Sequence, residues 1–338
     1  MLCHVVVPTK YLKSDSCDVS CLNNFQVKET IVSRWISTKI DTFLFDCDGV
    51  LWQGNIAVKG APAVVAHLKS LGKQVCYVTN NSTKSRHRYV EKLTRLGFPA
   101  DVNSVFSTAY TSALYLKNIA KVQGKVYLVG NPAMAEELDS LKIQHFGSGP
   151  DNQVTTQDHD EVRSCALEND VSAVLVGYDG HISYTKMIKA ASYLNDPKCL
   201  YVATNEDHRM PLNGERHVVP GTGCVVASVT VAAGRNPDVI AGKPGTFMLK
   251  CIQQTVEIDP TKCMMVGDRM NTDILFGNQS ELHTLLVLSG VEDQESLNKA
   301  VESSDPNMKR QVPEYCMGSI GDWWHDLPLT VHYLKNTT

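Results

Sequence analysis

The chain has 338 residues, about twice the length of an ordinary domain, and 43% of them are hydrophobic. Charged residues make up 20%, and 32 Lys and Arg against 36 Asp and Glu give a net charge of −4. This composition excludes a disordered, collagen-like or coiled-coil chain, and it provides no basic excess for nucleic acid or an anionic membrane. We therefore expect two globular units and a partner that is small or protein-like.

Two features concern the compartment. No apolar run reaches the roughly 18 residues of a transmembrane helix, and the first ten residues lack the pattern of a secretory signal. The 11 cysteines are odd in number and scattered, which favours reduced thiols in a cytoplasmic protein. Cys17 and Cys21 have the spacing of a metal-binding pair, but no second pair follows nearby.

Residues 1–36 show no sustained period, and we expect them to be an N-terminal extension outside the core. After them, short runs rich in β-branched residues alternate with amphipathic segments, which predicts an α/β fold with a doubly wound parallel sheet. The expected strands are Thr42–Phe45, Gln74–Thr79, Lys125–Gly130, Ala173–Gly177, Leu200–Thr204, Val239–Ala241, Cys263–Val266 and Thr284–Leu288.

The helix predictions rest on apolar spacing and on capping residues. Apolar residues recur at helical spacing over Ala61–Leu68, and Gly72 is expected to end that helix. A second helix is predicted to start at Ser82 and to end at Gly97. Pro220–Gly223 looks like a dinucleotide-binding loop, but a lone GxG is weak, and we interpret it as a tight turn before a helix around Val225–Ala233.

The first chemical signal is the pair Asp46 and Asp48, which follows the strand at 42–45 directly. Alternation along an extended chain points both carboxylates to one side, at the strand end where open α/β sheets bind ligands. Two acids in one small volume need a cation, and hard oxygen ligands suit Mg²⁺. The alternatives are a turn with surface acids and a calcium loop, which the position of Gly49 disfavours.

Two more strand ends carry polar residues that suit an anion. Thr79, Asn80, Asn81 and Ser82 follow one strand and offer hydroxyl, amide and backbone N–H groups, although the same residues suit plain helix capping. Lys243 follows the strand at 239–241 and can offset phosphate charge, although a solvated loop lysine is the alternative.

A fourth strand end carries Asp268 and Asp273, five residues apart, after the strand at 263–266. Asp268 is a candidate metal ligand, and Asp273 is a candidate supporting acid that orients Asp268 or the lysine. The alternative is a helix cap with an aspartate in its first turn.

Taken together and in this order, the four segments resemble the four motifs of the haloacid dehalogenase-like superfamily, most of whose members are phosphatases. The resemblance covers roughly residues 38–330. About 160 residues separate Asn81 from Lys243, so an inserted domain is required. The resemblance implies a core of residues 37–121 and 238–338 and an α/β cap of residues 122–237.

The resemblance also implies roles for the motif residues. Asp46 is expected to attack phosphorus and form an aspartyl-phosphate, and Asp48 to act as general acid and then as general base. Mg²⁺ is expected to bind the Asp46 side chain, the Asp48 backbone carbonyl and Asp268. Thr79 and Lys243, with backbone N–H groups, are expected to neutralise the phosphoryl oxygens, and Asn80 and Asn81 to bind substrate.

The phrases FDCDGVLWQGNIAVKGAP and VTNNS resemble the subclass that contains phosphoglycolate (glycerol-3-phosphate), pyridoxal and p-nitrophenyl phosphatases. Pyridoxal phosphatases carry a histidine at the position of Met210, and Arg209 can pair with a substrate carboxylate, or alternatively lie in a rim or dimer-interface salt bridge. We therefore expect 2-phosphoglycolate or glycerol 3-phosphate as substrate. Pyridoxal 5′-phosphate and a phosphoprotein are the alternatives, and the subclass implies a homodimer formed through the cap.

One departure and three other classes of function stay open. Asn271 stands where such relatives usually have an acid, which predicts weaker Mg²⁺ affinity. A phosphotransferase uses the same core, whereas retention of both Asp46 and Asp48 argues against a catalytically inactive phosphate-binding or interaction module. An NAD-linked oxidoreductase is disfavoured because no G-x-G-x-x-G follows the first strand.

Overall fold

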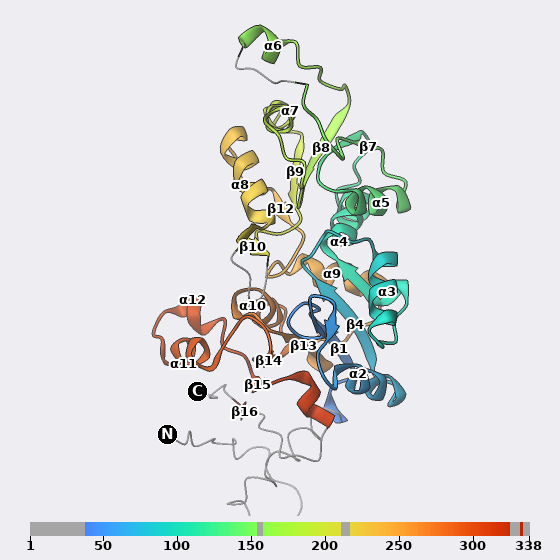
Figure 1. Cartoon of the computed structure of the whole chain (residues 1–338), viewed down its shortest axis with the longest axis vertical. Coiled ribbons are helices and arrows are strands. Elements are labelled where there is room, and N and C mark those ends of the chain that lie inside the picture. Colours follow the sequence, from blue (N-terminus) through green and yellow to red (C-terminus); the bar gives the residue numbers. More distant parts are fainter. Residues whose placement is uncertain (1–37, 154–157, 211–216, 325–331, 334–338) are drawn as a thin grey trace, which may run out of the picture. The chain divides into compact units, whose positions relative to one another are not determined.

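The computed structural model describes residues 38–153, 158–210, 217–324 and 332–333, which belong to two units (Figure 1). Of these residues, the first unit takes those within 38–78, 91–104 and 256–333, and the second takes those within 79–90 and 105–255. The predicted extension at 1–36, with Cys17 and Cys21, lies outside the described residues. The two units divide at other residues than the predicted core and cap. The bounds of the core and the cap therefore stay a prediction.

The first unit contains a mainly parallel sheet. Its strands are β1 (Thr42–Phe45), β4 (Gln74–Thr79), β13 (Cys263–Gly267), β14 (His283–Val287), β15 (Tyr315–Met317) and β16 (His332–Tyr333). They lie in the order β16-β15-β14-β13-β1-β4, with only β16 antiparallel to its neighbour. All four residues of β1 are buried, as expected for a strand covered on both faces. A separate hairpin pairs β2 (Trp52–Gln53) with β3 (Ile56–Ala57).

Helices flank this sheet in the first unit. They are α2 (Ala61–Ser70), α10 (Leu275–Gln279), α11 (Gln294–Glu302) and α12 (Pro306–Lys309), with a π-helix at Met270–Ile274 and 3-10 helices at Val102–Ser104, Pro260–Lys262 and Ile320–Trp324. The predicted apolar stripe of α2 is buried, and the chain turns at Gly72 with φ +75°, a conformation that suits glycine. On α11, Leu297 and Ala300 belong to a core cluster with Leu286 of β14.

The second unit is built on a five-stranded parallel sheet (Figure 1). Its order is β12 (Val239–Ile240), β9 (Leu200–Ala203), β8 (Val171–Val176), β6 (Lys125–Val129) and β7 (His145–Phe146). The unit also contains β5 (Val105–Ser107) and a short antiparallel pair, β10 (Arg209–Met210) with β11 (Val219–Pro220). The strand carrying Lys243 therefore belongs to this sheet, because β12 pairs with β9.

The helices of the second unit are α4 (Thr108–Leu114), which continues as a π-helix at Tyr115–Ile119, α5 (Pro132–Ser140), α6 (His159–Arg163), α7 (Tyr184–Leu194), α8 (Thr222–Ala233) and α9 (Phe247–Thr255). Four of them, α4, α5, α7 and α8, cover the two faces of the five-stranded sheet. Successive residues of β6 point to opposite faces. Val126 and Leu128 pack with α4 and α5, whereas Tyr127 and Val129 pack with α7 and α8. The second unit is thus a three-layer α/β/α arrangement (Figure 1).

The predicted helix start at Ser82 is wrong, because α3 (Arg86–Arg95) begins four residues later. The Asn81 Oδ1 atom accepts hydrogen bonds from the N–H and the hydroxyl of Thr83, which holds these residues in a turn. Glu137 of α5 then accepts a hydrogen bond from the backbone N–H of Arg86 at 2.6 Å. A side chain from another helix therefore fixes where α3 starts.

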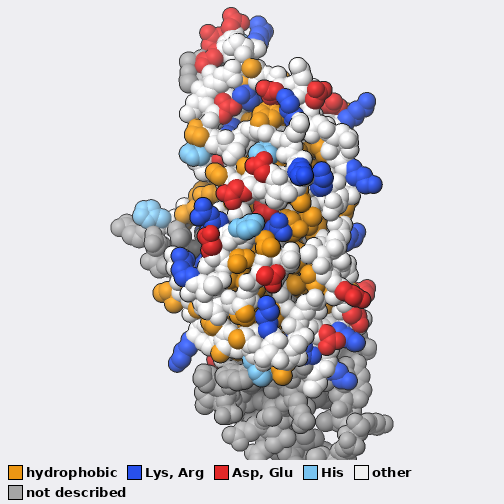
Figure 2. Space-filling model, turned by 90° about the vertical axis from the view of Figure 1, so that its right-hand side faces the viewer, with side chains coloured by type: hydrophobic (Ala, Val, Ile, Leu, Met, Phe, Trp, Pro, Cys, Tyr) orange, Lys and Arg blue, Asp and Glu red, His pale blue; other side chains and the backbone are white. Residues whose placement is uncertain are grey.

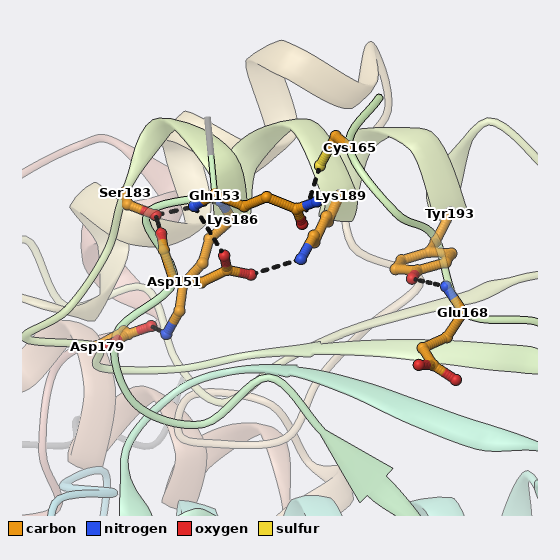
Figure 3. Close-up of polar contacts among 9 residues, drawn as sticks. All are labelled: Asp151, Gln153, Cys165, Glu168, Asp179, Ser183, Lys186, Lys189 and Tyr193. Atoms are coloured by element: carbon orange, nitrogen blue, oxygen red, sulfur yellow. Dashed lines mark hydrogen bonds and ion pairs between the residues drawn. The ribbon is translucent and has the colours of Figure 1, made fainter. Parts of the chain in front are cut away.

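A polar network joins a loop of the second unit to α7 (Figure 3). Lys186 and Asp179 form an ion pair of 2.5 Å with side chains 0% and 1% exposed. Lys189 pairs with Asp151 at 2.7 Å, and the Ser183 hydroxyl donates to the Asp151 backbone carbonyl. Because these contacts satisfy the buried charges, the loop around Asp151 is anchored on the helix.

Neither positively nor negatively charged side chains dominate the face drawn in Figure 2. Basic and acidic side chains are interspersed among the coloured residues of that face. None of the helices in the described part of the chain combines the length and the apolar character needed to span a bilayer.

Candidate active site

The end of β1 positions Asp46. The Asp46 N–H donates to the Val266 carbonyl of β13 at 2.8 Å, which extends the pairing of these strands by one residue. The strand itself ends at Phe45, so Asp46 and Asp48 lie in the loop that follows. The prediction that an extended chain points both carboxylates to one side is therefore wrong, because neither residue lies in the strand. Each of the two acids has its own hydrogen-bonding partners.

Three carboxylates of the first unit form an acidic cluster: Asp46, Asp268 and Asp273. One oxygen from each lies within 4.8 Å of the others, and the residues are 8%, 2% and 1% exposed. Asp273 Oδ2 accepts hydrogen bonds from the backbone N–H groups of Asp268 and Arg269 at 3.2 and 3.1 Å. Asp268 Oδ2 accepts one from the Val291 N–H at 2.9 Å. Neutral N–H donors offset only part of the repulsion among three buried acids.

The acidic cluster fits a hard divalent cation. Three buried carboxylates form an all-oxygen donor set, which is what such cations prefer. Two glycines leave space for the Asp268 carboxylate. A Cβ at Gly49 would lie 2.2 Å from Asp268 Oδ2, and one at Gly290 would lie 1.9 Å from the same oxygen. Gly49 also has φ +89°, a conformation that side chains rarely adopt. The loops after β1 and β14 therefore approach Asp268 as closely as backbone allows.

Asp48 lies outside the acidic cluster and is held by Trp52. The Trp52 indole N–H donates to Asp48 Oδ1 at 2.7 Å, and Trp52 is 0% exposed. Lys92 lies over the indole ring, 4.2 Å from its centroid, and Phe98 packs edge-on against it. No role for Trp52 is predicted from the sequence. Its position four residues after Asp48 is the one available signal.

The polar turn after β4 belongs to the second unit. Thr79 is 2% exposed, and its hydroxyl oxygen accepts a hydrogen bond from the Asn81 N–H at 3.1 Å. The Asn81 carbonyl accepts a hydrogen bond from the Tyr89 hydroxyl of α3 at 3.1 Å. The turn is thus fixed at both ends by side-chain hydrogen bonds.

The second unit also contains the predicted lysine and the predicted substrate loop. Lys243 is 2% exposed, and its backbone is hydrogen-bonded by the Asn80 side chain. Arg209 is exposed and Met210 is half-buried on β10. Asn271, the departure noted in the sequence, is exposed in the first unit.

Two family models match separate parts of the chain. The model described as haloacid dehalogenase-like hydrolase matches residues 43–144, and a second, HAD-hydrolase-like model matches residues 240–311. The first match contains Asp46, Asp48 and Thr79, and the second contains Lys243 and Asp268. All four predicted motifs therefore lie within the matched residues.

Named relatives match nearly the whole chain. The glycerol-3-phosphate phosphatase of Gallus gallus is 44% identical over 292 residues, covering 86% of this chain and 93% of the relative. The structure of a p-nitrophenyl phosphatase from Archaeoglobus fulgidus superposes with a TM-score of 0.70 at 26% identity, covering 84% and 98% of the two chains. A glycerol phosphate phosphatase from Mycobacterium tuberculosis, solved in complex with magnesium, superposes with a TM-score of 0.68 at 26% identity, covering 87% and 78%.

Proposed function

Since this chain belongs to the haloacid dehalogenase-like hydrolases and is a phosphatase, we propose that it hydrolyses a small phosphomonoester through an aspartyl-phosphate on Asp46. The comparisons confirm the resemblance and the α/β fold that the four motifs predicted. The observation that carries the mechanism is the acidic cluster, which places Asp46 beside two further buried carboxylates. Its oxygens suit Mg²⁺, which when bound would neutralise charge on the phosphoryl group.

We propose the following proton and bond changes. An Asp46 carboxylate oxygen attacks phosphorus, the bond to the leaving alkoxide breaks, and Asp48 gives its proton to that alkoxide. Asp48 then takes a proton from water, the water oxygen attacks phosphorus, and the bond to Asp46 breaks with release of phosphate. The Trp52 indole supports this role, because it holds one Asp48 oxygen and leaves the other to carry the proton. Thr79 and Lys243 are proposed to bind the phosphoryl oxygens, with help from Asn81.

The test of the nucleophile is the Asp46→Asn variant. It should fold normally and lose the release of p-nitrophenol from p-nitrophenyl phosphate in the presence of Mg²⁺. The matched control is Asp41→Asn, which changes an exposed aspartate immediately before the same strand and should keep the wild-type rate. A wild-type rate in Asp46→Asn would show that the nucleophile is assigned wrongly.

For the substrate, we propose glycerol 3-phosphate or 2-phosphoglycolate. The proposal is supported by the 44% identity to a glycerol-3-phosphate phosphatase and by Met210 at the position expected for a pyridine-facing histidine. Arg209 is exposed and is proposed to pair with a carboxylate where the substrate has one. Comparison of kcat/KM on both compounds and on pyridoxal 5′-phosphate tests this. Equal values for all three would remove the preference.

The metal, the compartment and the assembly are proposals of the same kind. Activity should require Mg²⁺ and be lost on chelation. All eight cysteines in the described residues are free, which supports a reducing, cytoplasmic compartment. A homodimer formed through the cap is proposed from the resemblance, and light scattering on the purified protein tests it.

A further inference from the structure

The Asn80 side chain and the Lys243 backbone form a reciprocal pair of hydrogen bonds, which we call the Asn80 clasp. The Lys243 N–H donates to Asn80 Oδ1 at 2.8 Å, and Asn80 Nδ2 donates to the Lys243 carbonyl at 2.9 Å. Asn80 is 8% exposed and Lys243 is 2% exposed, so water competes little with either bond. Two bonds to one planar amide fix both the position and the direction of the Lys243 backbone.

The residues before Lys243 are also closely packed. The Ala241 N–H donates to the Ala203 carbonyl at 2.9 Å, which continues the pairing of β12 with β9. At Gly242, a Cβ would lie 2.6 Å from Asn80 Oδ1 and 2.7 Å from the Thr204 carbonyl oxygen. The chain therefore passes between β9 and Asn80 with no space to spare.

The Asn80 clasp also reaches the loop that carries the proposed substrate residues. The Asn80 Nδ2 atom makes a long hydrogen bond of 3.4 Å to Asp207 Oδ2, and Asn205 Nδ2 donates to the same oxygen at 2.8 Å. The Asp207 carbonyl accepts from the Gly223 N–H at the start of α8. A primary amide has two N–H groups, and those of Asn80 are directed to Lys243 and Asp207.

We propose that Asn80 is a positioning residue: it acts on catalysis through Lys243, and through Asp207 on the loop with Arg209, instead of by contact between its side chain and the substrate. This inference rests on the proposed function, because it assumes that Lys243 binds the phosphoryl group. It assigns the Asn80 side chain a different task from the substrate binding expected from the sequence, and it makes Asp207 a second positioning residue.

A double-mutant cycle on kcat for p-nitrophenyl phosphate tests the inference, using Asn80→Ala, Lys243→Met and the double variant. Loss of the clasp should lower kcat by roughly 10- to 100-fold, because a shift of about 1 Å can have that effect. Lys243→Met should lower kcat by roughly 10²–10³-fold. If Asn80 acts through the lysine, the double variant should match Lys243→Met within about 3-fold. A double variant with the product of the two losses would overturn the proposal.

Conservative variants separate positioning from general structural damage. Asn80→Asp keeps an acceptor for the Lys243 N–H but donates no hydrogen bond. It replaces Asn80→Ala in the cycle if the alanine variant has a clearly lower melting temperature than the wild type. Asp207→Ala should raise KM more than it lowers kcat, and Asp207→Asn, which keeps an acceptor oxygen, should recover most of the KM. Asn118→Ala removes an exposed side-chain hydrogen bond to Gln254 in the same unit and should leave kcat unchanged.

The outcomes distinguish the two proposals. A wild-type protein without phosphatase activity would overturn the proposed function, and the positioning role would fall with it. An active wild type with multiplicative losses in the cycle would overturn the positioning role alone. If the wild type is active but Asp207→Asn has a KM as high as that of Asp207→Ala, Asp207 is removed from the proposal.

Discussion

Replacing Gly290 by alanine perturbs the acidic cluster without removing any of its carboxylates. The added Cβ would lie 1.9 Å from Asp268 Oδ2 and 2.5 Å from both Cβ and Cγ of that residue. Real Cβ atoms essentially never approach closer than 3.0 Å, so the Asp268 carboxylate has to move by about 1 Å. The displaced oxygen is the one that accepts the Val291 N–H at 2.9 Å, and this hydrogen bond is expected to break as well.

The size of the effect follows from the geometry that the metal requires. Mg²⁺ binds oxygen at about 2.0–2.1 Å in a nearly ideal octahedron, and functional sites keep ligand distances within about 0.2 Å. A shift of about 1 Å is several times that tolerance. Loss of a supporting contact at a metal ligand typically weakens affinity about 10- to 100-fold. We expect Gly290→Ala to weaken Mg²⁺ binding by at least that factor, or about 1.4–2.8 kcal/mol.

Two measurements check the expectation. The Mg²⁺ concentration for half-maximal phosphate release should rise about 10- to 100-fold, and the rise in melting temperature on adding Mg²⁺ should shrink. Gly180→Ala is the control, because a Cβ there meets nothing within 4 Å. If folded Gly290→Ala responds to Mg²⁺ at the wild-type concentration in both assays, Asp268 is not a ligand and the reasoning fails.

Three further predictions concern stability, thiols and specificity. Lys186→Met should lower the free energy of unfolding, measured in urea, by about 3–5 kcal/mol, because its aspartate partner stays buried and unpaired. Lys125→Met, at an exposed ion pair, should change that free energy little. Equal losses in the two variants would contradict this prediction. Iodoacetamide at pH 8 should label exposed Cys224 well before Cys251, whose pKa burial raises to about 12; equal labelling in peptide mass spectra would be inconsistent. Met210→His should raise kcat/KM for pyridoxal 5′-phosphate over glycerol 3-phosphate roughly tenfold; an unchanged ratio removes that role.

The parallel strands could be predicted from the sequence because their pattern is local. A run such as Thr42–Phe45 is apolar throughout, and a strand buried on both faces needs that and little else. Each of the eight predicted strands is present, with ends that differ by at most two residues. Because ligands bind at the carboxyl ends of parallel strands, locating the strands also located Asp46 and Asp268 as candidates.

Boundaries that depend on distant residues could not be predicted. Ser82 is a good capping residue by type, yet α3 begins at Arg86, where Glu137 of α5 accepts the first N–H. Nothing within a few residues of Arg86 carries that information. The same holds for Gly290, whose lack of a side chain matters only because Asp268 lies against it.

The contacts made by the chemical residues could not be predicted, for a related reason. Motifs reveal candidate groups but not their partners: Asn80 was expected to bind substrate, and Trp52 had no expected role. Trp52 holds Asp48, and Asn80 holds the backbone of Lys243, a residue 163 positions away. Both contacts depend on how turns and strands are aligned, and a shift of one residue in either would abolish them while leaving every motif letter in place. The neutral residues therefore determine where the charged ones act, and only the structure shows the contacts through which they do so.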